Sequence, residues 1–386
     1  MNRVLEHIKG DRVIWGIAFL LSFFSMLAVY SSTGTLAYKY QAGNTEYYLI
    51  KHSSILFLGL SLMYVAHKIH YRYYSRISLF LLILSVPLLL ITLLIGTNLN
   101  EAQRWITLPI INLSFQTSDL AKMALIMFLA RTLSKRQDMI KDFGNGFVPL
   151  VIPVFIVCAL IAPADLSTAV ILFITSLILM FMGRVAIKHL ALLIGSVVLV
   201  AALAVSLLFS LPAEVLAKTG RAATWKSRLV SFSDKEAAVP YQVQQAKIAI
   251  AKGGIFGEGP GKSGQRNFLP HPYSDFIYAI VLEEYGFIGG MIVLCLYIIL
   301  LFRTIQIVIN SPGAFGALLA LGLMFNLVIQ ALTNMAVAVN LLPVTGLTLP
   351  FISMGGTSLF FTSISLGVVL SVSRNIELTN NKNVGK

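Results

Sequence analysis

Long apolar segments dominate the pattern of hydrophobic and polar positions along this chain. A helix needs roughly 20 mostly apolar residues to cross the hydrocarbon core of a bilayer, and segments of about this length recur from end to end. The predicted membrane-spanning helices are near residues 13–32, 53–69, 77–96, 118–134, 146–163, 165–182, 188–211, 275–302, 312–340 and 357–374. We therefore predict an all-α polytopic membrane protein with ten transmembrane helices in a single membrane domain, residues 1–386.

Composition supports the membrane class and excludes several others. Hydrophobic residues make up 57% of the chain and charged residues 12%, with a mean hydropathy of +0.83. A soluble domain has about 25% charged residues, so this chain cannot cover a soluble globule, and it is neither a disordered protein nor a disulfide scaffold. Cys158 and Cys295 each lie inside an apolar segment, as small buried residues do.

The distribution of Lys and Arg predicts the orientation. The net charge is +13, and the N-terminal segment, the even-numbered loops and the C-terminal tail carry many of the basic residues. The short odd-numbered loops carry Lys39, Lys51 and Arg104. Because cytoplasmic loops are enriched in Lys and Arg, both termini are expected in the cytoplasm, with the first span an uncleaved signal anchor. The excess charge then needs no nucleic-acid partner.

The long outer loop, residues 212–274 between the seventh and eighth spans, contains two distinct segments. Residues 237–252 place Val239, Val243, Ala246 and Ile250 at helical spacing, which predicts an amphipathic helix lying at the bilayer surface. A glycine-rich segment follows, and the Gly-Lys-Ser run within it lacks the earlier glycine of a phosphate-binding P-loop. Lys262 and Arg266 could still hold a phosphate together with backbone amides.

Acidic residues lie at the start of the eighth span and inside it. Asp275 stands where the outer loop enters the helix, and could be a reactive carboxylate or a simple helix cap. Glu283 and Glu284 follow within the apolar run. Ionisable groups at membrane depth are costly and usually line a cavity or carry function, so a chemical role and a hydrogen-bonding structural role both remain open for these two.

The third outer loop and the fourth span add a polar group. Arg104 and Trp105 suit an anionic headgroup or a sugar ring, although Trp105 could instead be an interfacial anchor. Polar residues then cluster at the outer end of the fourth helix, namely Gln116, Ser118, Asp119 and Lys122. The spacing of Asp119 and Lys122 allows an internal ion pair.

Two further segments carry polar groups or irregular backbone. Asp165 opens the sixth span in a pattern that is also typical of a helix N-cap. Residues 341–358, LLPVTGLTLPFISMGGTS, are uncharged and contain two prolines and three glycines. We expect this segment to fold back into the protein as a re-entrant element that lines a cavity.

These motifs together resemble those of one protein family, the SEDS proteins (shape, elongation, division and sporulation), which include FtsW, RodA and SpoVE. Residues 103–106 are similar to the family's RRWI, 116–122 to its QPSE-x-x-K and 163–169 to its QPDLGTA. Residues 241–290 and 341–359 resemble its outer-loop and most recognisable stretches. Thr117 and Asp119 replace the proline and glutamate of QPSE, and His271 and Tyr273 replace a glutamate and a histidine of LPEAHTDF.

The resemblance implies a peptidoglycan glycosyltransferase that polymerises lipid II at the outer face of the bacterial cytoplasmic (inner) membrane. It also implies a class B penicillin-binding protein as transpeptidase partner, with other divisome proteins, and an essential role for Asp275. Short tails and motif details favour the division-type, FtsW-like role, with an elongation-type, RodA-like role as the alternative. A lipid II flippase and a recruiting scaffold are the other candidate functions.

Under that resemblance the residues take chemical roles. An α-linked donor that gives a β-linked product requires one inverting displacement, with one general base and a stabilised leaving group. Asp275 is the candidate base, or a ligand for a divalent cation (Mg or Mn). The candidate substrate-binding residues are Arg104, Trp105, Gln116, Ser118, Lys122, Lys262 and Arg266.

Overall fold

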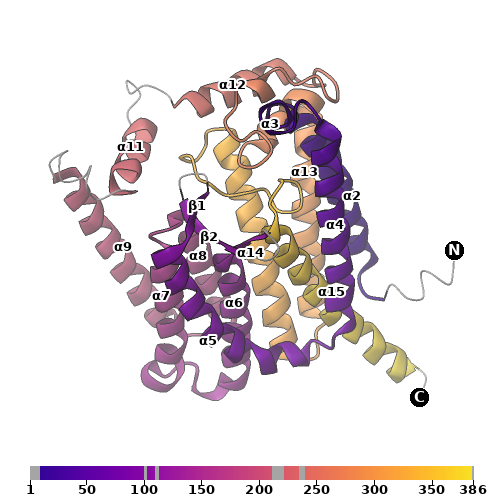
Figure 1. Cartoon of the computed structure of the whole chain (residues 1–386). Coiled ribbons are helices and arrows are strands. Elements are labelled where there is room, and N and C mark those ends of the chain that lie inside the picture. Colours follow the sequence, from indigo (N-terminus) through magenta and orange to yellow (C-terminus); the bar gives the residue numbers. More distant parts are fainter. Residues whose placement is uncertain (1–8, 100–101, 109–112, 211–220, 234–239, 385–386) are drawn as a thin grey trace.

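The predicted helical membrane architecture is confirmed by the computed structural model, which describes residues 9–99, 102–108, 113–210, 221–233 and 240–384. A helix coincides with each predicted span (Figure 1). These helices are α2 (Arg12–Ser32), α4 (Thr45–Lys68), α5 (Arg72–Ile95), α6 (Thr117–Lys135), α7 (Val148–Ile161), α8 (Leu166–Met182), α9 (Ile187–Ser210), α13 (Ile277–Ile309), α14 (Ala314–Ala338) and α15 (Thr357–Val384).

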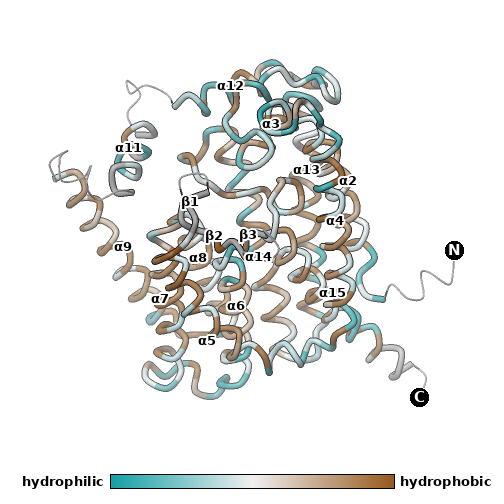
Figure 2. Tube along the Cα trace, in the orientation of Figure 1, coloured by the Kyte–Doolittle hydropathy of each residue, from teal (hydrophilic) through white to brown (hydrophobic). Residues whose placement is uncertain are grey.

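Eight helices in the described residues are long and apolar enough to cross a membrane, and α8 is apolar but shorter. The helix at the fourth predicted span, α6, is not among the eight, and it contains Asp119, Lys122, Arg131 and Lys135. The count of ten spans therefore stays a prediction. Apolar residues fill the middle of the bundle and polar residues gather toward its two ends (Figure 2), as a lipid environment requires.

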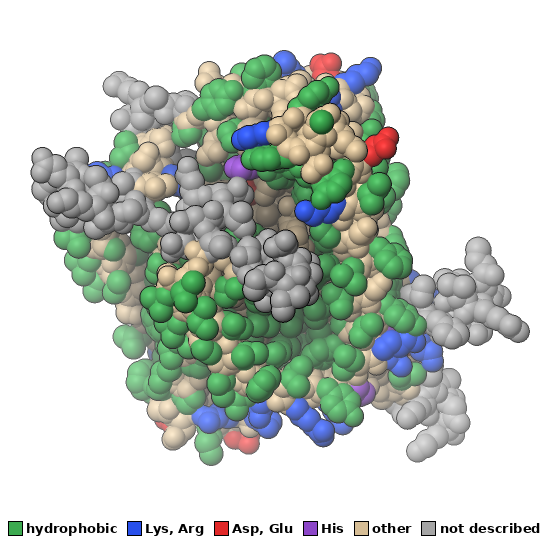
Figure 3. Space-filling model, viewed as in Figure 1, with side chains coloured by type: hydrophobic (Ala, Val, Ile, Leu, Met, Phe, Trp, Pro, Cys, Tyr) green, Lys and Arg blue, Asp and Glu red, His purple; other side chains and the backbone are tan. Residues whose placement is uncertain are grey.

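Basic side chains line the end of the bundle where the α4–α5 and α6–α7 connections lie, and others lie at the opposite end (Figure 3). The end with these connections includes Lys68, Arg72, Lys135 and Arg136. The location agrees with the bias that we used to assign a cytoplasmic side. The opposite end, which carries the outer loop, is called the outer end below.

Helix α14 lies at the centre of the bundle. It packs against α6, α8, α13 and α15, and its side chains Leu319, Ala320, Met324 and Ala331 are almost completely buried. Helix α9 is the opposite case, because only His189, Leu190 and Leu193 of its residues are buried, and it slants away from the bundle (Figure 1). The core of the protein thus surrounds α14.

Several short elements were not predicted from the sequence. A three-stranded antiparallel sheet, β1 (Thr97–Leu99), β2 (Ala102–Leu108) and β3 (Leu113–Gln116), connects α5 to α6 in the order β1-β2-β3. Helices α3 (Gly34–Tyr40) and α11 (Arg221–Ser233) lie at the outer end. Single helical turns occupy Gln137–Met139, Phe143–Phe147 and Gln265–Asn267.

The predicted amphipathic helix of the outer loop is present as α12 (Tyr241–Gly253). Its small apolar face packs against protein: Ala246 and Ala249 form a buried cluster with Phe276 and Ile280 at the start of α13. This face is thus covered by α13, and the location of the helix at the bilayer surface stays a prediction. Val239, which was also assigned to this face, lies outside the described residues.

The glycine-rich segment after α12 fills a break in α13. Gly286 has φ 65° and ψ −168°, which interrupts the helix. The amide of Glu258 donates to the carbonyl of Glu283 at 3.0 Å, that of Gly259 to the carbonyl of Glu284 at 3.0 Å, and that of Phe287 to the carbonyl of Gly254 at 2.9 Å. Backbone groups that the break removes from the helix are thus paired with the loop.

The side chains of Glu283 and Glu284 hold the same loop. Glu283 accepts hydrogen bonds from the amides of Gly264 (3.1 Å) and Gln265 (3.2 Å) and from the hydroxyl of Ser263. Glu284 accepts from the amide of Ser263 at 3.3 Å and from the hydroxyl of Ser31 on α2. The structural alternative for these two buried carboxylates is confirmed.

The glycine-rich loop lies so close to α13 that we expect position 257 to require glycine. A Cβ on Gly257, which has φ +81°, would lie 2.2 Å from the carbonyl oxygen of Glu284. We expect Gly257→Ala to lower the stability of the protein by about 1–3 kcal/mol and to expose the outer loop to protease. Gly16→Ala is the control, because nothing lies within 4 Å of its added methyl group. Equal melting temperatures and cleavage rates for the two variants would contradict the close approach.

Candidate functional site

A cavity of about 300 Å³ opens at the outer end of the bundle and includes Asp275 in its wall. Chain segments that are far apart in the sequence contribute to it. We call it the Asp275 cavity; its walls include Trp105, Gln116, Asp119, Lys122, Asp165, Thr168, Arg228, Gln242, Pro270, His271, Ser274, Asp275, Gln330, Ser358 and residues 344–348.

Asp275 lies in the turn before α13, and its backbone is firmly held. Helix α13 begins at Ile277 with Phe276 in the N-cap position, so the alternative that Asp275 caps this helix is wrong. The Nδ2 of Asn334 on α14 donates to the carbonyl oxygen of Asp275 at 2.9 Å. The hydroxyl of Ser274 donates to Oδ1 of the Asp275 carboxylate at 2.9 Å.

The segment 341–356 folds back against this turn, as the sequence predicts. Asn334 Nδ2 donates to the carbonyl of Leu347 at 2.7 Å, and Gln330 Nε2 donates to that of Thr348 at 3.0 Å. The hydroxyl of Ser353 donates to the carbonyl of Ser274 at 2.7 Å. Two amide side chains one turn apart on α14 therefore satisfy the irregular backbone that forms one wall of the cavity.

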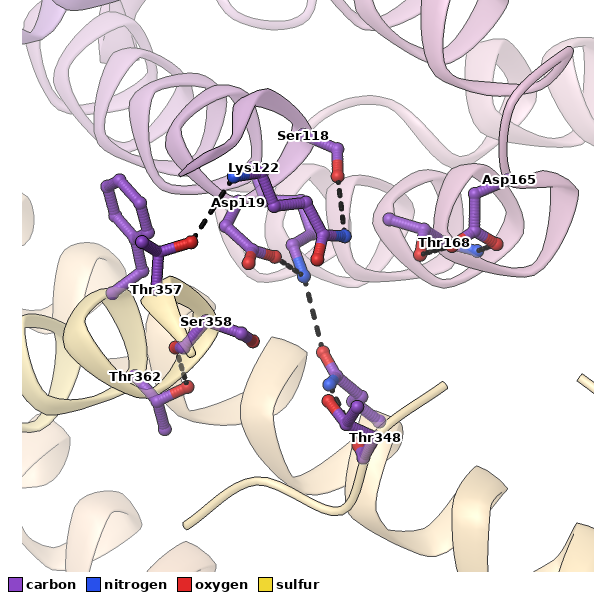
Figure 4. A network of polar contacts seen from close by, with 12 residues as sticks. Ser118, Asp119, Lys122, Asp165, Thr168, Thr348, Thr357, Ser358 and Thr362 are labelled. Atoms are coloured by element: carbon purple, nitrogen blue, oxygen red, sulfur yellow. Dashed lines mark hydrogen bonds and ion pairs between the residues drawn. The ribbon is translucent and has the colours of Figure 1, made fainter. Parts of the chain in front are cut away.

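Asp119 and Lys122 form the ion pair that their spacing allows. The Lys122 Nζ lies 2.8 Å from Asp119 Oδ1, and both side chains are at least nine-tenths buried. Lys122 also donates to Gln330 Oε1 at 3.3 Å (Figure 4). The second carboxylate oxygen of Asp119 is buried and has no hydrogen-bond partner among the described residues. The pair also forms part of the cavity wall.

Asp165 is the N-cap residue of α8. One of its carboxylate oxygens accepts from the Thr168 amide at 3.1 Å and the other from the Thr168 hydroxyl at 2.8 Å (Figure 4). The cap alternative for this residue is confirmed. Because Asp165 also lines the Asp275 cavity, the cap brings a third carboxylate to the site.

The small sheet positions two further predicted residues. Trp105 on β2 pairs with Gln116 on β3, and both side chains line the Asp275 cavity. Ser118 supports this arrangement, because its hydroxyl accepts a hydrogen bond from Gln116 Nε2 at 3.0 Å. The side chain of Arg104, which neighbours Trp105, lies outside the part of the chain whose side chains are described.

Lys262 and Arg266 do not line this cavity. Docking of the glycine-rich loop into the α13 break directs Arg266 toward α2, where its Nη1 donates to the Ser31 carbonyl at 3.1 Å. The amides of residues 263–265 donate to Glu283 and Glu284. The amides of residues 263–265 thus bind the protein's own carboxylates, and a phosphate role for Lys262 and Arg266 stays a prediction.

Some lining residues were not identified from the sequence. Arg228 of α11 and Gln242 of α12 reach the cavity from the outer loop, and Gln330 reaches it from α14. A polar residue within the long apolar run of α14 is a signal that could have indicated Gln330. No comparable pattern marks Arg228, because its position depends on how α11 packs.

Metal binding by Asp275 remains a prediction. Three carboxylates line the cavity, but no group of three or more His, Cys, Asp or Glu residues close enough to hold a metal ion occurs in the described residues. Asp119 and Asp165 already have partners within the protein. Burial raises the pKa of the neighbouring Tyr273 above its ordinary value, and the Tyr273 hydroxyl lies 3.3 Å from Nδ1 of His271.

A family comparison agrees with this architecture. A model of the FtsW, RodA and SpoVE family, described as cell cycle protein, matches residues 11–378. The chain belongs to the FtsW/RodA/SpoVE family. Among curated family members, it is 34% identical over 375 residues to a Geobacter protein named "probable peptidoglycan glycosyltransferase FtsW", covering 96% of this chain and 98% of that one. It is also 34% identical over 371 residues to stage V sporulation protein E of Bacillus subtilis, covering 94% and 97%.

Solved structures of the family share the fold. A chain from a peptidoglycan synthase complex that coordinates polymerization and crosslinking superimposes with a TM-score of 0.71 at 26% identity, covering 95% of this chain and 98% of that one. The rod shape determining protein RodA of Thermus thermophilus superimposes with a TM-score of 0.65 at 25% identity, covering 95% and 97%.

The buried ion pair in the cavity wall can be tested by stability. Lys122→Met leaves the Asp119 carboxylate buried without its cation, and we expect a loss of about 3 kcal/mol. Replacing both residues, Asp119→Leu with Lys122→Met, removes the unpaired charge and should recover most of that loss. Thermal unfolding of the purified protein in detergent measures both variants.

Lys135→Met is the matched control, because this lysine is exposed at the other end of α6. It should leave the melting temperature unchanged. A double variant as unstable as Lys122→Met alone would show that the pair does not act as a coupled unit.

Proposed function

We propose that this protein is a peptidoglycan glycosyltransferase that polymerises lipid II at the outer face of the bacterial inner membrane, with both termini in the cytoplasm. The observation that carries the proposal is the position of Asp275, which lines an outer-end cavity together with Trp105, Gln116 and Lys122. Membership of the FtsW/RodA/SpoVE family and the names of its curated relatives support the activity.

The reaction requires one displacement at carbon. The 4-hydroxyl of the acceptor sugar attacks the anomeric carbon of the donor, a new C–O bond forms, and the bond to the lipid pyrophosphate breaks. The Asp275 carboxylate accepts the proton of the attacking hydroxyl as general base. Its backbone is held by Asn334, which positions the carboxylate before the substrate arrives. A divalent cation at Asp275, if bound, would neutralise charge on the pyrophosphate.

In this proposal, cationic side chains of the cavity wall stabilise the pyrophosphate leaving group. Lys122 is buried and held by Asp119 and Gln330, and Arg228 lines the same space. Together with Arg104 they are the groups that we assign to the pyrophosphate. We leave Lys262 and Arg266 out of this set, since their loop docks on α13. Trp105 is assigned to the sugar or lipid, and Gln116 with Ser118 to the headgroup.

We propose a division role in septal wall synthesis, together with a class B penicillin-binding protein and other divisome proteins. Several curated relatives are named FtsW, and the related peptidoglycan synthase complex couples polymerization to crosslinking. A flippase fits less well. The headgroup pathway would need Asp119, Lys122, Glu283 and Glu284 in one channel, whereas Glu283 and Glu284 bind the outer loop.

The decisive variant is Asp275→Asn, which preserves the size of the side chain and removes the base. We expect glycan formation from purified lipid II, with the class B partner present, to fall by about 100- to 10,000-fold, the contribution of a positioned general base. Folding and membrane insertion should be unchanged. Gel analysis of labelled products measures the effect.

Asp138→Asn is the control, because this carboxylate is exposed in the α6–α7 connection. It should polymerise normally. Full activity of Asp275→Asn would remove this residue from the chemistry. Proteoliposomes with lipid II already on the exposed leaflet separate the flippase alternative, since a transporter would move the lipid and form no glycan.

A further inference from the structure

A second cavity, of about 490 Å³, adjoins the Asp275 cavity at the outer end. It lies between α11, α12 and residues 340–344, and we call it the α11 cavity. Arg228, Gln242 and Val344 line both cavities. Because they share these three residues, the two cavities adjoin each other.

One face of α11 forms the polar wall of this space. Thr224, Ser227, Arg228 and Ser231 all line it, and their spacing of three and four residues places them on one side of a helix. The guanidinium of Arg228 donates to the Val344 carbonyl at 3.1 Å. This bond connects α11 to the segment that also borders the Asp275 cavity.

The chemistry of the wall limits what can bind. Hydroxyl groups of α11 face the amides of Gln242 and Asn340, and Val243 and two prolines add apolar surface. Arg228 is the charged residue of the described lining, and no carboxylate occurs among these residues. Among the described lining residues a cationic ligand finds no carboxylate, whereas a ligand rich in hydroxyl and amide groups, neutral or anionic, finds donors and acceptors.

A polymerase needs a binding site for its product strand beside the place where the new bond forms. The Asp275 cavity is where the new bond forms, but the product stays attached to the reacting sugar and must extend away from it. A saccharide strand carries hydroxyl and amide groups at its edges and apolar C–H faces, with carboxylates on its peptides. The α11 cavity matches these groups and adjoins the Asp275 cavity.

We propose that the α11 cavity binds the saccharide units of the growing glycan strand next to the unit that reacts at Asp275. This inference rests on the proposed polymerase function. Occupation of the cavity would keep the strand on the enzyme between additions, so the cavity determines how many units are added before release. It contributes little to formation of the first bond.

Filling the cavity is the direct test. Ser231→Trp places an indole in the space that the strand would occupy. With purified lipid II and the class B partner, we expect the mean glycan length to fall by about tenfold, the effect of losing roughly 1.4 kcal/mol of strand binding. The initial rate of first-bond formation should stay within about twofold, as for substitutions away from the reacting groups.

Lys226→Trp is the matched control for bulk. Lys226 lies on the same helix but outside the cavity lining, with its Nζ 5.6 Å from the ring centre of Phe209. This variant should make strands of normal length. The double variant Ser227→Ala with Ser231→Ala removes two hydroxyls without adding volume, and it should also shorten the product. This variant tests the proposal if Ser231→Trp does not fold.

Two outcomes would overturn the proposal. One is normal strand length from the folded cavity variants; the other is an equal loss of first-bond rate and length, which would assign the cavity to the reacting pair. Failure of the proposed function is distinguishable, because the unmodified protein would then form no glycan at all. A protein that polymerises, with only strand length changed by Ser231→Trp, supports the α11 cavity as a strand site.

Discussion

Hydrogen bonding of irregular backbone by α14 is the constraint on which the rest of the site depends. Backbone groups at membrane depth have no water to pair with and must be satisfied within the protein. The turn that carries Asp275 and the segment 341–356 are both non-helical. Asn334 and Gln330 supply the missing donors. The most buried part of the bundle thus determines where the candidate base lies.

The same requirement applies at Gly286, where the first part of α13 ends. Gly286 breaks the helix, and the glycine-rich loop pairs with the carbonyls of Glu283 and Glu284. Residues 277–285 therefore form a short helix that is fixed at one end by α14 and at the other by the loop. A reacting group on a rigid element keeps its geometry better than one on a mobile loop, and Asp275 directly precedes such an element.

Sequence reasoning worked where one physical signal dominates. Long apolar runs located the helices, the spacing of Asp119 and Lys122 indicated their ion pair, and the uncharged segment 341–358 was correctly expected to fold back. The cap pattern at Asp165 was also correct, although its presence in the cavity was not visible, because that depends on how α8 packs beside α6.

The failures have a common cause. The loop amides of residues 263–265 bind Glu283 and Glu284, about 20 residues further along the chain, and no local pattern shows that pairing. The sheet between α5 and α6 consists of strands too short for a clear alternating pattern. The polar face of α11 was not predicted from the sequence. Polar residues three and four positions apart indicate a cavity wall only when the elements opposite them are known.

The charges of the cavity show why Lys122 can be buried there at all. An isolated ammonium at this depth would be costly, and the Asp119 carboxylate 2.8 Å away offsets that cost and holds the ammonium in the wall. One oxygen of Asp119 remains without a hydrogen-bond partner among the described residues, so the pair is not fully satisfied by the protein. Under the proposed function, a lipid-linked pyrophosphate would bring further oxygens toward the same ammonium, which has three N–H donors. The ion pair therefore holds the Lys122 ammonium in the cavity wall, in the position where an anion that enters the cavity could reach it.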